Sequence, residues 1–184
     1  RAAEALARAC AEVPGVETEH VDSLQYTTRL FRQIYSRAYL ELVDHAPEVL
    51  GWLYDHFDRP WRNMRRRLAL DRLNTLPFVR RLERFQPDVC ISTHFLPSEI
   101  VSWLIAKKRL RTRHAVVVTD VDVHALWLCR HFEYYFVARE ETRRHLIALG
   151  LPPEKVVVSG IPIDPLFAQP KDQAEMRRKR GLAA

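Results

Sequence analysis

Hydrophobic and polar residues alternate with two different periods along the 184-residue chain, that of a helix and that of a strand. Residues 1–13 place apolar side chains at the spacing of an amphipathic helix, which is expected to end at Pro14-Gly15. Residues 16–22 (VETEHVD) alternate, which predicts a strand. From about residue 28 to 86 the helical spacing returns, and breaks are expected wherever a proline removes a backbone N–H. These prolines are Pro47, Pro60 and Pro77.

After residue 86, short β-branched runs alternate with helical stretches. The predicted strands are 89–93, 114–119, 134–138 and 155–160, and the predicted helices are 97–110 and 139–150. Such runs are typical of parallel strands buried on both faces, with helices in the connections. The sequence therefore predicts an α/β fold: a Rossmann-like, doubly wound and mostly parallel sheet, with a helical insertion at about residues 28–86.

Polar residues follow two of the predicted strands at their carboxyl ends. One strand runs into His94, and the next runs into Asp120, Asp122 and His124 at every second position. Because ligands of doubly wound sheets bind beyond the carboxyl ends of the strands, these side chains are expected on one rim. Carboxylates and imidazoles on such a rim could hold hydroxyl groups or remove a proton. The competing interpretation is that Asp120 caps a turn and His124 is merely exposed.

Several kinds of site find no support in the sequence. No zinc-protease, hydrolase-elbow or P-loop pattern occurs, and the five glycines form no phosphate-binding loop. The rim residues could also hold a divalent ion, but their spacing matches no fixed metal motif, so no metal is predicted. The three cysteines, which are widely spaced in apolar stretches, are expected to be buried thiols of a reducing compartment and not a disulfide framework or a zinc site. No run approaches the roughly 20 apolar residues of a membrane-spanning helix.

Positive charge is concentrated in the second half of the predicted insertion. The formal net charge is +6, and nine arginines fall within residues 59–84 against Asp71 and Glu83. Trp61, Phe78 and several leucines are interleaved with them, as in segments that lie on anionic membrane surfaces. A solvated arginine-rich helix face is an equally open interpretation. Binding to nucleic acid is disfavoured, because no stacking platform or helix-turn-helix pattern accompanies the charge.

Three long stretches resemble a known family: PDVCISTHFLPSEIVSWL, VVVTDVDVHALWLC and YYFVAREETRRHLIALGLPPEKVVVSGIPIDPLF. With the opening RAAEAL and the upstream LQYTTRLFRQIYSRAYLELVDHAPEVLGWLYD, they are similar to the N-terminal domain of monogalactosyldiacylglycerol synthases and bacterial diacylglycerol glucosyltransferases. The likeness covers nearly the whole chain. It implies the GT-B fold, in which two Rossmann-like domains face each other across a cleft, and this chain would be the N-terminal half.

The resemblance also implies an activity. The expected reaction is inverting transfer of a hexose from UDP-glucose or UDP-galactose to diacylglycerol, with the donor bound mainly by a C-terminal domain and no cofactor in this chain. Residues 1–168 would be the acceptor-side domain, and residues 169–184 would begin the linker to the C-terminal domain. Family members carry a first strand and a glycine-rich loop with a histidine, a leading candidate for the catalytic base, before the helix that begins here at Arg1. The chain alone is therefore expected to be inactive.

The rim and the resemblance together give each residue an expected role. Asp120 is predicted to be the base or to orient the missing histidine, while His94, Asp122 and His124 shape the acceptor side. Asp22 is a weaker candidate that could simply cap a turn. The insertion is predicted to dock on anionic lipids, which makes the protein cytoplasmic and peripheral on the membrane. The docking residues are Trp61, Arg62, Arg65, Arg66 and Arg67.

Two alternatives to this function remain open. A related GT-B transferase could use another lipid-linked acceptor, although the THFLP and TDVDVHALW stretches favour diacylglycerol. A single GT-B half could also serve as a non-catalytic membrane- or protein-binding module. The residues do not decide between glucose and galactose.

Overall fold

The computed structural model describes residues 1–28, 75–167 and 169–182. It consists of two units, one formed by residues 1–19 and 162–184 and the other by residues 20–161. The smaller unit contains the helices α1 (Ala2–Ala11) and α8 (Gln173–Lys179) and the short 3-10 helix η4 (Pro165–Phe167). Within it, Arg8 pairs with both Glu4 and Asp164.

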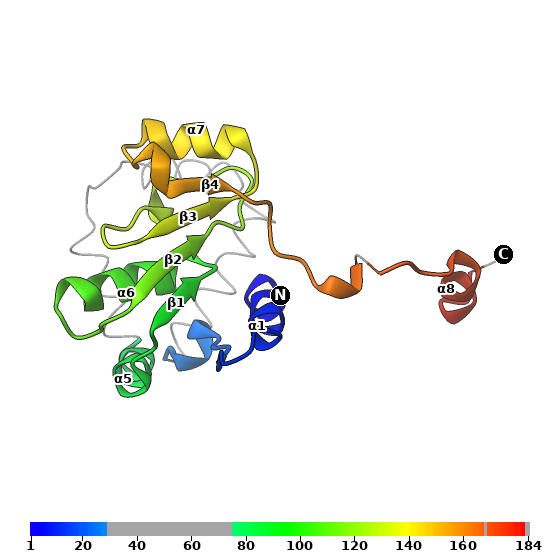
Figure 1. Cartoon of the computed structure of the whole chain (residues 1–184), viewed down its shortest axis with the longest axis horizontal. Helices are drawn as coiled ribbons and strands as arrows, with labels where there is room; N and C mark the ends of the chain where they lie inside the picture. The colour runs from blue at the N-terminus through cyan, green and yellow to red at the C-terminus, as the bar shows by residue number, and fades with distance from the viewer. Residues whose placement is uncertain (29–74, 168, 183–184) are drawn as a thin grey trace. The chain divides into compact units, whose positions relative to one another are not determined.

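The larger unit contains a four-stranded, all-parallel sheet in the order β1-β2-β3-β4. The strands are β1 (Val89–Ser92), β2 (Arg113–Val117), β3 (Tyr134–Val137) and β4 (Val156–Val158). The same unit contains the helices α5 (Leu76–Phe85), α6 (Phe95–Ala106) and α7 (Glu140–Ala148) and the 3-10 helices η1 (Ser23–Tyr26), η2 (Ala125–Trp127) and η3 (Pro153–Lys155). Figure 1 shows the four carboxyl ends along one edge of the sheet. The predicted Rossmann-like α/β architecture is confirmed.

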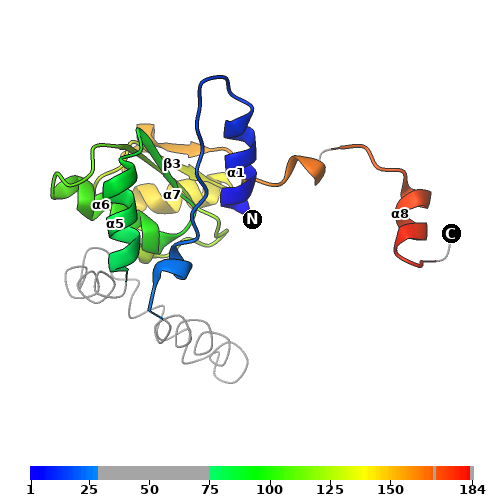
Figure 2. The same cartoon turned by 90° about the horizontal axis from the view of Figure 1, so that it is seen from below.

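The parallel register determines which strand side chains are buried. Val116 pairs with Tyr135, and Tyr135 pairs with Val156, so these three side chains lie on the same face and all are buried. Helices α6 and α7 both cover this face (Figure 2). Right-handed crossovers between neighbouring strands place their helices on the same side of a sheet, which explains this arrangement.

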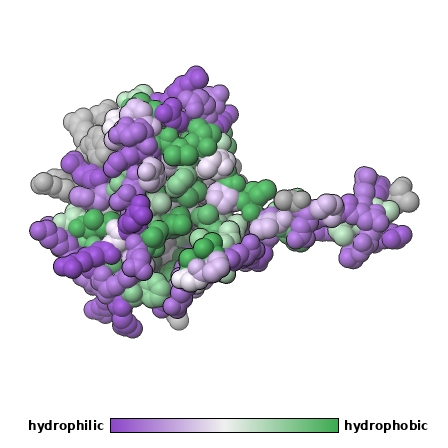
Figure 3. Space-filling view, in the orientation of Figure 1, coloured by the Kyte–Doolittle hydropathy of each residue, from purple (hydrophilic) through white to green (hydrophobic). Residues whose placement is uncertain are grey.

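The opposite face of the sheet carries apolar side chains that are only partly covered. Val89 is 53% exposed, Ile91 and Tyr134 are both 42% exposed, and Val157 is 38% exposed. In Figure 3, hydrophobic residues gather over the strands inside a hydrophilic border. Among the described residues, the expected burial on both faces therefore holds for one face only.

The predicted strand at residues 16–22 is wrong. This segment has no strand partner in the described parts of the chain, and residues 16–20 are exposed. Its two valines, Val16 and Val21, are an odd number of positions apart, so a strand would direct them to opposite faces. Asp22 instead caps η1, where its carboxylate accepts a hydrogen bond from the backbone N–H of Leu24 at 3.0 Å. The capping interpretation of Asp22 is confirmed.

The predicted helical insertion is described only at its end. Helix α5 begins at Leu76, and Pro77 lies in its first turn, where a missing N–H costs no helical hydrogen bond. A helix that begins next to this proline agrees with the interruption predicted there. Residues 29–74, including all the predicted membrane-docking residues, lie outside the described part.

A buried polar network fixes the connection between β2 and β3. The Tyr135 hydroxyl accepts a hydrogen bond from the Cys129 N–H at 2.9 Å and donates one to the Trp127 carbonyl at 2.8 Å. Burial raises the pKa of Tyr135 well above its ordinary value, and it raises the pKa of the Cys129 thiol to about 12. Ser102 Oγ on α6 accepts from the backbone N–H groups of the next two residues, Arg130 at 3.2 Å and His131 at 3.0 Å.

Removing the hydroxyl in Tyr135→Phe is expected to lower the free energy of unfolding by about 1–3 kcal/mol, because a buried N–H and a buried carbonyl each lose their partner. Urea unfolding followed by circular dichroism measures this loss. The neighbouring Tyr134→Phe is the matched control, since Tyr134 is 42% exposed, and it should change stability by less than about 0.5 kcal/mol. Equal effects from both variants would show that the network does not stabilise the fold.

Candidate functional site

The ends of β1 and β2 bring the first candidate residues together. The Thr119 hydroxyl donates to the Thr93 carbonyl at 3.4 Å and links the two segments that follow these strands. His94 then begins α6 as its N-cap, because its Nδ1 accepts a hydrogen bond from the Leu96 N–H at 3.3 Å. Asp120 follows Thr119 directly. The parallel pairing thus places His94 and Asp120 at the same edge of the sheet.

Asp120 is held by two side chains from the following loop. Its Oδ2 accepts a hydrogen bond from Trp127 Nε1 at 2.7 Å and lies 3.4 Å from His124 Nε2. The hydrogen bond with His124 lowers the pKa of Asp120, the bond from Trp127 lowers it further, and partial burial opposes both. The carboxylate is therefore ionised, and its side chain remains 42% exposed.

Phe95 forms the apolar wall behind these groups. Its ring centroid lies 4.1 Å from that of His94, 5.5 Å from that of His124 and 6.1 Å from that of Trp127. Burial lowers the pKa of His94; the negative charge of Asp120 raises it and His124 lowers it. A neutral His94 whose Nδ1 accepts from Leu96 carries its proton on Nε2, so it can donate one hydrogen bond to a bound hydroxyl.

Asp122 lies apart from this group. Its side chain is 99% exposed and contacts Arg139 at 3.4 Å. The prediction placed Asp120, Asp122 and His124 on one side because alternate residues of a strand share a face. Strand β2 ends at Val117, however, so this spacing no longer applies three residues later. The structure thus brings together His94, Asp120 and His124, and it leaves Asp122 outside.

Trp127 is part of the site although sequence reasoning missed it. The side chain is almost fully buried, at 1% exposure, and its indole N–H is a donor that needs an acceptor when buried. Asp120, seven residues earlier, provides that acceptor. The signal in the sequence was a tryptophan, a residue whose N–H must be satisfied, close to an otherwise unexplained carboxylate.

The arrangement can hold and polarise a hydroxyl group. An ionised, partly exposed carboxylate accepts a hydrogen bond from a hydroxyl and can orient an imidazole that takes its proton. Across the described ranges, no group of three His, Cys, Asp or Glu side chains could hold a metal ion. No helix among those ranges is long and apolar enough to cross a membrane.

The electrostatic coupling inside the site can be measured on His94. Because the Asp120 carboxylate stabilises the protonated imidazole, Asp120→Asn is expected to lower the pKa of His94 below its wild-type value. A histidine titration followed by NMR between pH 4 and 8 (about the range in which imidazoles titrate) gives both values. Asp122→Asn is the matched control and should leave the His94 titration unchanged. A higher pKa in Asp120→Asn would contradict the described geometry.

Comparison with known proteins agrees with this architecture. The model of the family described as monogalactosyldiacylglycerol (MGDG) synthase matches residues 1–163. The uncharacterized glycosyltransferase YkoN of Bacillus subtilis (strain 168) is 28% identical over 158 residues, which are 85% of this chain and 42% of that protein. A processive diacylglycerol beta-glucosyltransferase of Staphylococcus aureus (strain bovine RF122 / ET3-1) is 33% identical over 90 residues, 49% of this chain and 22% of that protein.

The chain thus spans less than half the length of these relatives. The family match nevertheless covers most of it and includes the carboxyl ends of all four strands. The parallel sheet is that of a Rossmann-like domain, as expected for one half of a GT-B enzyme. The chain therefore belongs to the monogalactosyldiacylglycerol synthase family.

Proposed function

We propose that this chain is the acceptor-binding half of an inverting glycosyltransferase that moves a hexose from a UDP-sugar to diacylglycerol. The observation that supports this proposal most directly is the ionised Asp120, held by Trp127 and His124 at the carboxyl edge of the sheet in a chain of this family. The Staphylococcus aureus relative is named a processive diacylglycerol beta-glucosyltransferase, which supports diacylglycerol as the acceptor to test. UDP-glucose and UDP-galactose are the two donors to test.

In the proposed reaction, the acceptor hydroxyl attacks the anomeric carbon of the hexose. A bond forms between this oxygen and the carbon, the bond from the carbon to the UDP oxygen breaks, and the hydroxyl proton passes to a base. The lowered pKa of Asp120 makes it a weak base and favours the second of its two expected roles, that of orienting an imidazole. His124 and Trp127 position the carboxylate, and His94 donates a hydrogen bond on the acceptor side.

We further propose that the protein works as a peripheral protein at the cytoplasmic surface of a membrane. Diacylglycerol resides in the bilayer, so its hydroxyl can be reached only at that surface. The Trp61 and arginine cluster predicted to dock on anionic lipids lies outside the described residues, and its role is part of this proposal.

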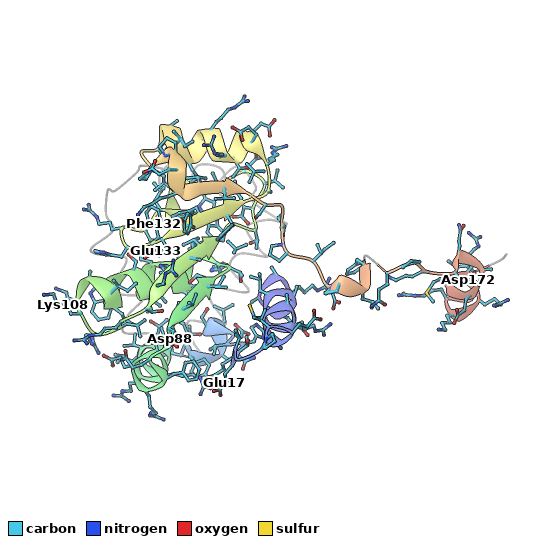
Figure 4. The ribbon with its side chains drawn as sticks, viewed as in Figure 1. Glu17, Asp88, Lys108, Phe132, Glu133 and Asp172 are labelled. Carbon is cyan, nitrogen blue, oxygen red and sulfur yellow. The ribbon has the colours of Figure 1, made fainter. Side chains whose placement is uncertain are left out.

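The first experiment expresses the complete reading frame and incubates it with UDP-glucose or UDP-galactose and liposomes that contain diacylglycerol. Glycolipid formation is expected with at least one donor. Asp120→Asn should reduce kcat by about 100-fold or more, since the carboxylate supports proton transfer. Asp88→Asn is the matched control, because Asp88 is exposed at the amino end of β1, and it should retain wild-type activity (Figure 4).

Two results would contradict the proposal. Full activity in a folded Asp120→Asn variant would remove this carboxylate from the chemistry. No product with either donor, from a wild-type protein that binds the liposomes, would favour another lipid-linked acceptor or a binding module without catalysis.

A further inference from the structure

A depression lies in the larger unit, in the segment that follows the candidate site along the chain. It has a volume of about 290 Å3 and opens between the segment that follows β2 and the start of α7. Its lining includes Val121, Asp122, Val123, Arg139, Glu141 and His145. Val121 and Asp122 directly follow Asp120 along the chain, so one wall of the depression belongs to the same segment as the proposed reaction centre.

The polar groups of the depression are paired only loosely. Arg139 Nη2 lies 3.4 Å from Asp122 Oδ1, and Arg139 Nε lies 3.7 Å from Glu141 Oε2. Well-formed bonds between a guanidinium and a carboxylate are shorter, about 2.7–2.9 Å. Both carboxylates are also mostly exposed, so all three groups can make stronger hydrogen bonds to a ligand than they make to one another.

The apolar wall of the depression is fixed in place. Thr142 is buried, and its hydroxyl donates to the Val121 carbonyl at 2.8 Å, which fastens this segment to α7. Val121 is 47% exposed and lies beside the buried Val123. The depression therefore offers a preformed apolar surface next to both hydrogen-bond donors and hydrogen-bond acceptors.

Charge and size define the ligand. One guanidinium and one imidazole against two carboxylates leave no excess of positive charge, which disfavours a phosphate or a nucleotide. The next cation along α7, Arg143, is engaged elsewhere, with the carbonyl oxygens of Val156 at 2.9 Å and Pro153 at 3.1 Å. The volume lies at the lower limit of the roughly 300–1,000 Å3 found for drug-sized ligands. A small neutral group with many hydroxyls and an apolar C–H face fits these properties.

We propose that this depression binds one neutral hexosyl group. The proposal rests on the glycosyl transfer proposed above, which provides two sources of such a group. It is either the hexose of the donor or the hexose of a lipid acceptor that already carries one sugar. In both cases Asp122 and Glu141 accept hydrogen bonds from sugar hydroxyls, Arg139 donates one, and the valines contact the C–H face.

Binding can be tested on the 184-residue chain by NMR titration with methyl β-glucopyranoside and methyl β-galactopyranoside. A hexoside should shift the resonances of Asp122, Glu141 and His145 in a saturable way, and glycerol should not. Glu141→Ala is expected to weaken binding about tenfold, through loss of a hydrogen bond to a charged acceptor. Glu133→Ala is the matched control, because Glu133 also lies 3.7 Å from an arginine, Arg113, but at the amino end of β3 (Figure 4). It should leave the affinity unchanged.

Three outcomes of this titration would overturn the proposal. They are the absence of saturable shifts, equal shifts with glycerol, and tighter binding of inorganic phosphate than of a hexoside. None of them depends on catalysis, so the depression is tested even if the proposed transfer reaction fails.

Kinetics of the complete reading frame identify the source of the hexose. If it comes from the donor, Glu141→Ala raises the KM for the UDP-hexose about tenfold. If it comes from the acceptor, the variant raises the KM for monohexosyl-diacylglycerol by a similar factor and leaves that for diacylglycerol unchanged. If Glu141→Ala has the wild-type KM for all three substrates, the proposal is overturned. If the wild-type enzyme makes no product from either acceptor, the proposed function is refuted. The NMR titration would still show whether the depression binds a hexosyl group.

Discussion

The parallel pairing of four strands is the constraint on which the rest of the larger unit depends. Each strand must be followed by a crossover before the next one begins, and all carboxyl ends therefore meet at one edge. The connections from β1 and β3 contain helices, α6 and α7, that bury their apolar sides on the sheet. The connection from β2 to β3 has only the short helix η2, so polar contacts hold it in addition to its buried apolar side chains. Ser102, Tyr135 and His114 provide them from the neighbouring elements.

Phe95 links the candidate site to the hydrophobic core of the larger unit. It packs against both buried clusters of the larger unit, one centred on α5 and α6 and the other on β2, β3 and α7. The same ring contacts His94, His124 and Trp127. The polar groups of the site therefore lie where two cores meet. Their positions are determined by packing of apolar side chains that have no part in the chemistry.

The sequence was sufficient to predict an element where its local pattern agrees with the tertiary structure. The β-branched runs predicted all four described strands to within about two residues at each end, and the helix predicted over residues 139–150 is α7, which ends two residues before Gly150 with its φ of 101°. Prediction failed at residues 16–22, where an alternating segment has no neighbouring strand to pair with in the described parts of the chain. It also failed at Asp122, where the alternation continues past the end of β2. The Trp127–Asp120 bond and the depression depend on how a loop folds back on α7 and Phe95. No periodicity encodes such contacts.

His94 has two functions that cannot be separated. Its imidazole forms part of the candidate site, and its Nδ1 and carbonyl satisfy backbone and side-chain groups in the first turn of α6. The N-cap hydrogen bond stabilises the first turn of α6, and the closed turn in return holds the imidazole in position. Assembly of the site is therefore a step of helix initiation. Fraying at the start of α6 would therefore displace His94 from the candidate site even while the sheet stays paired.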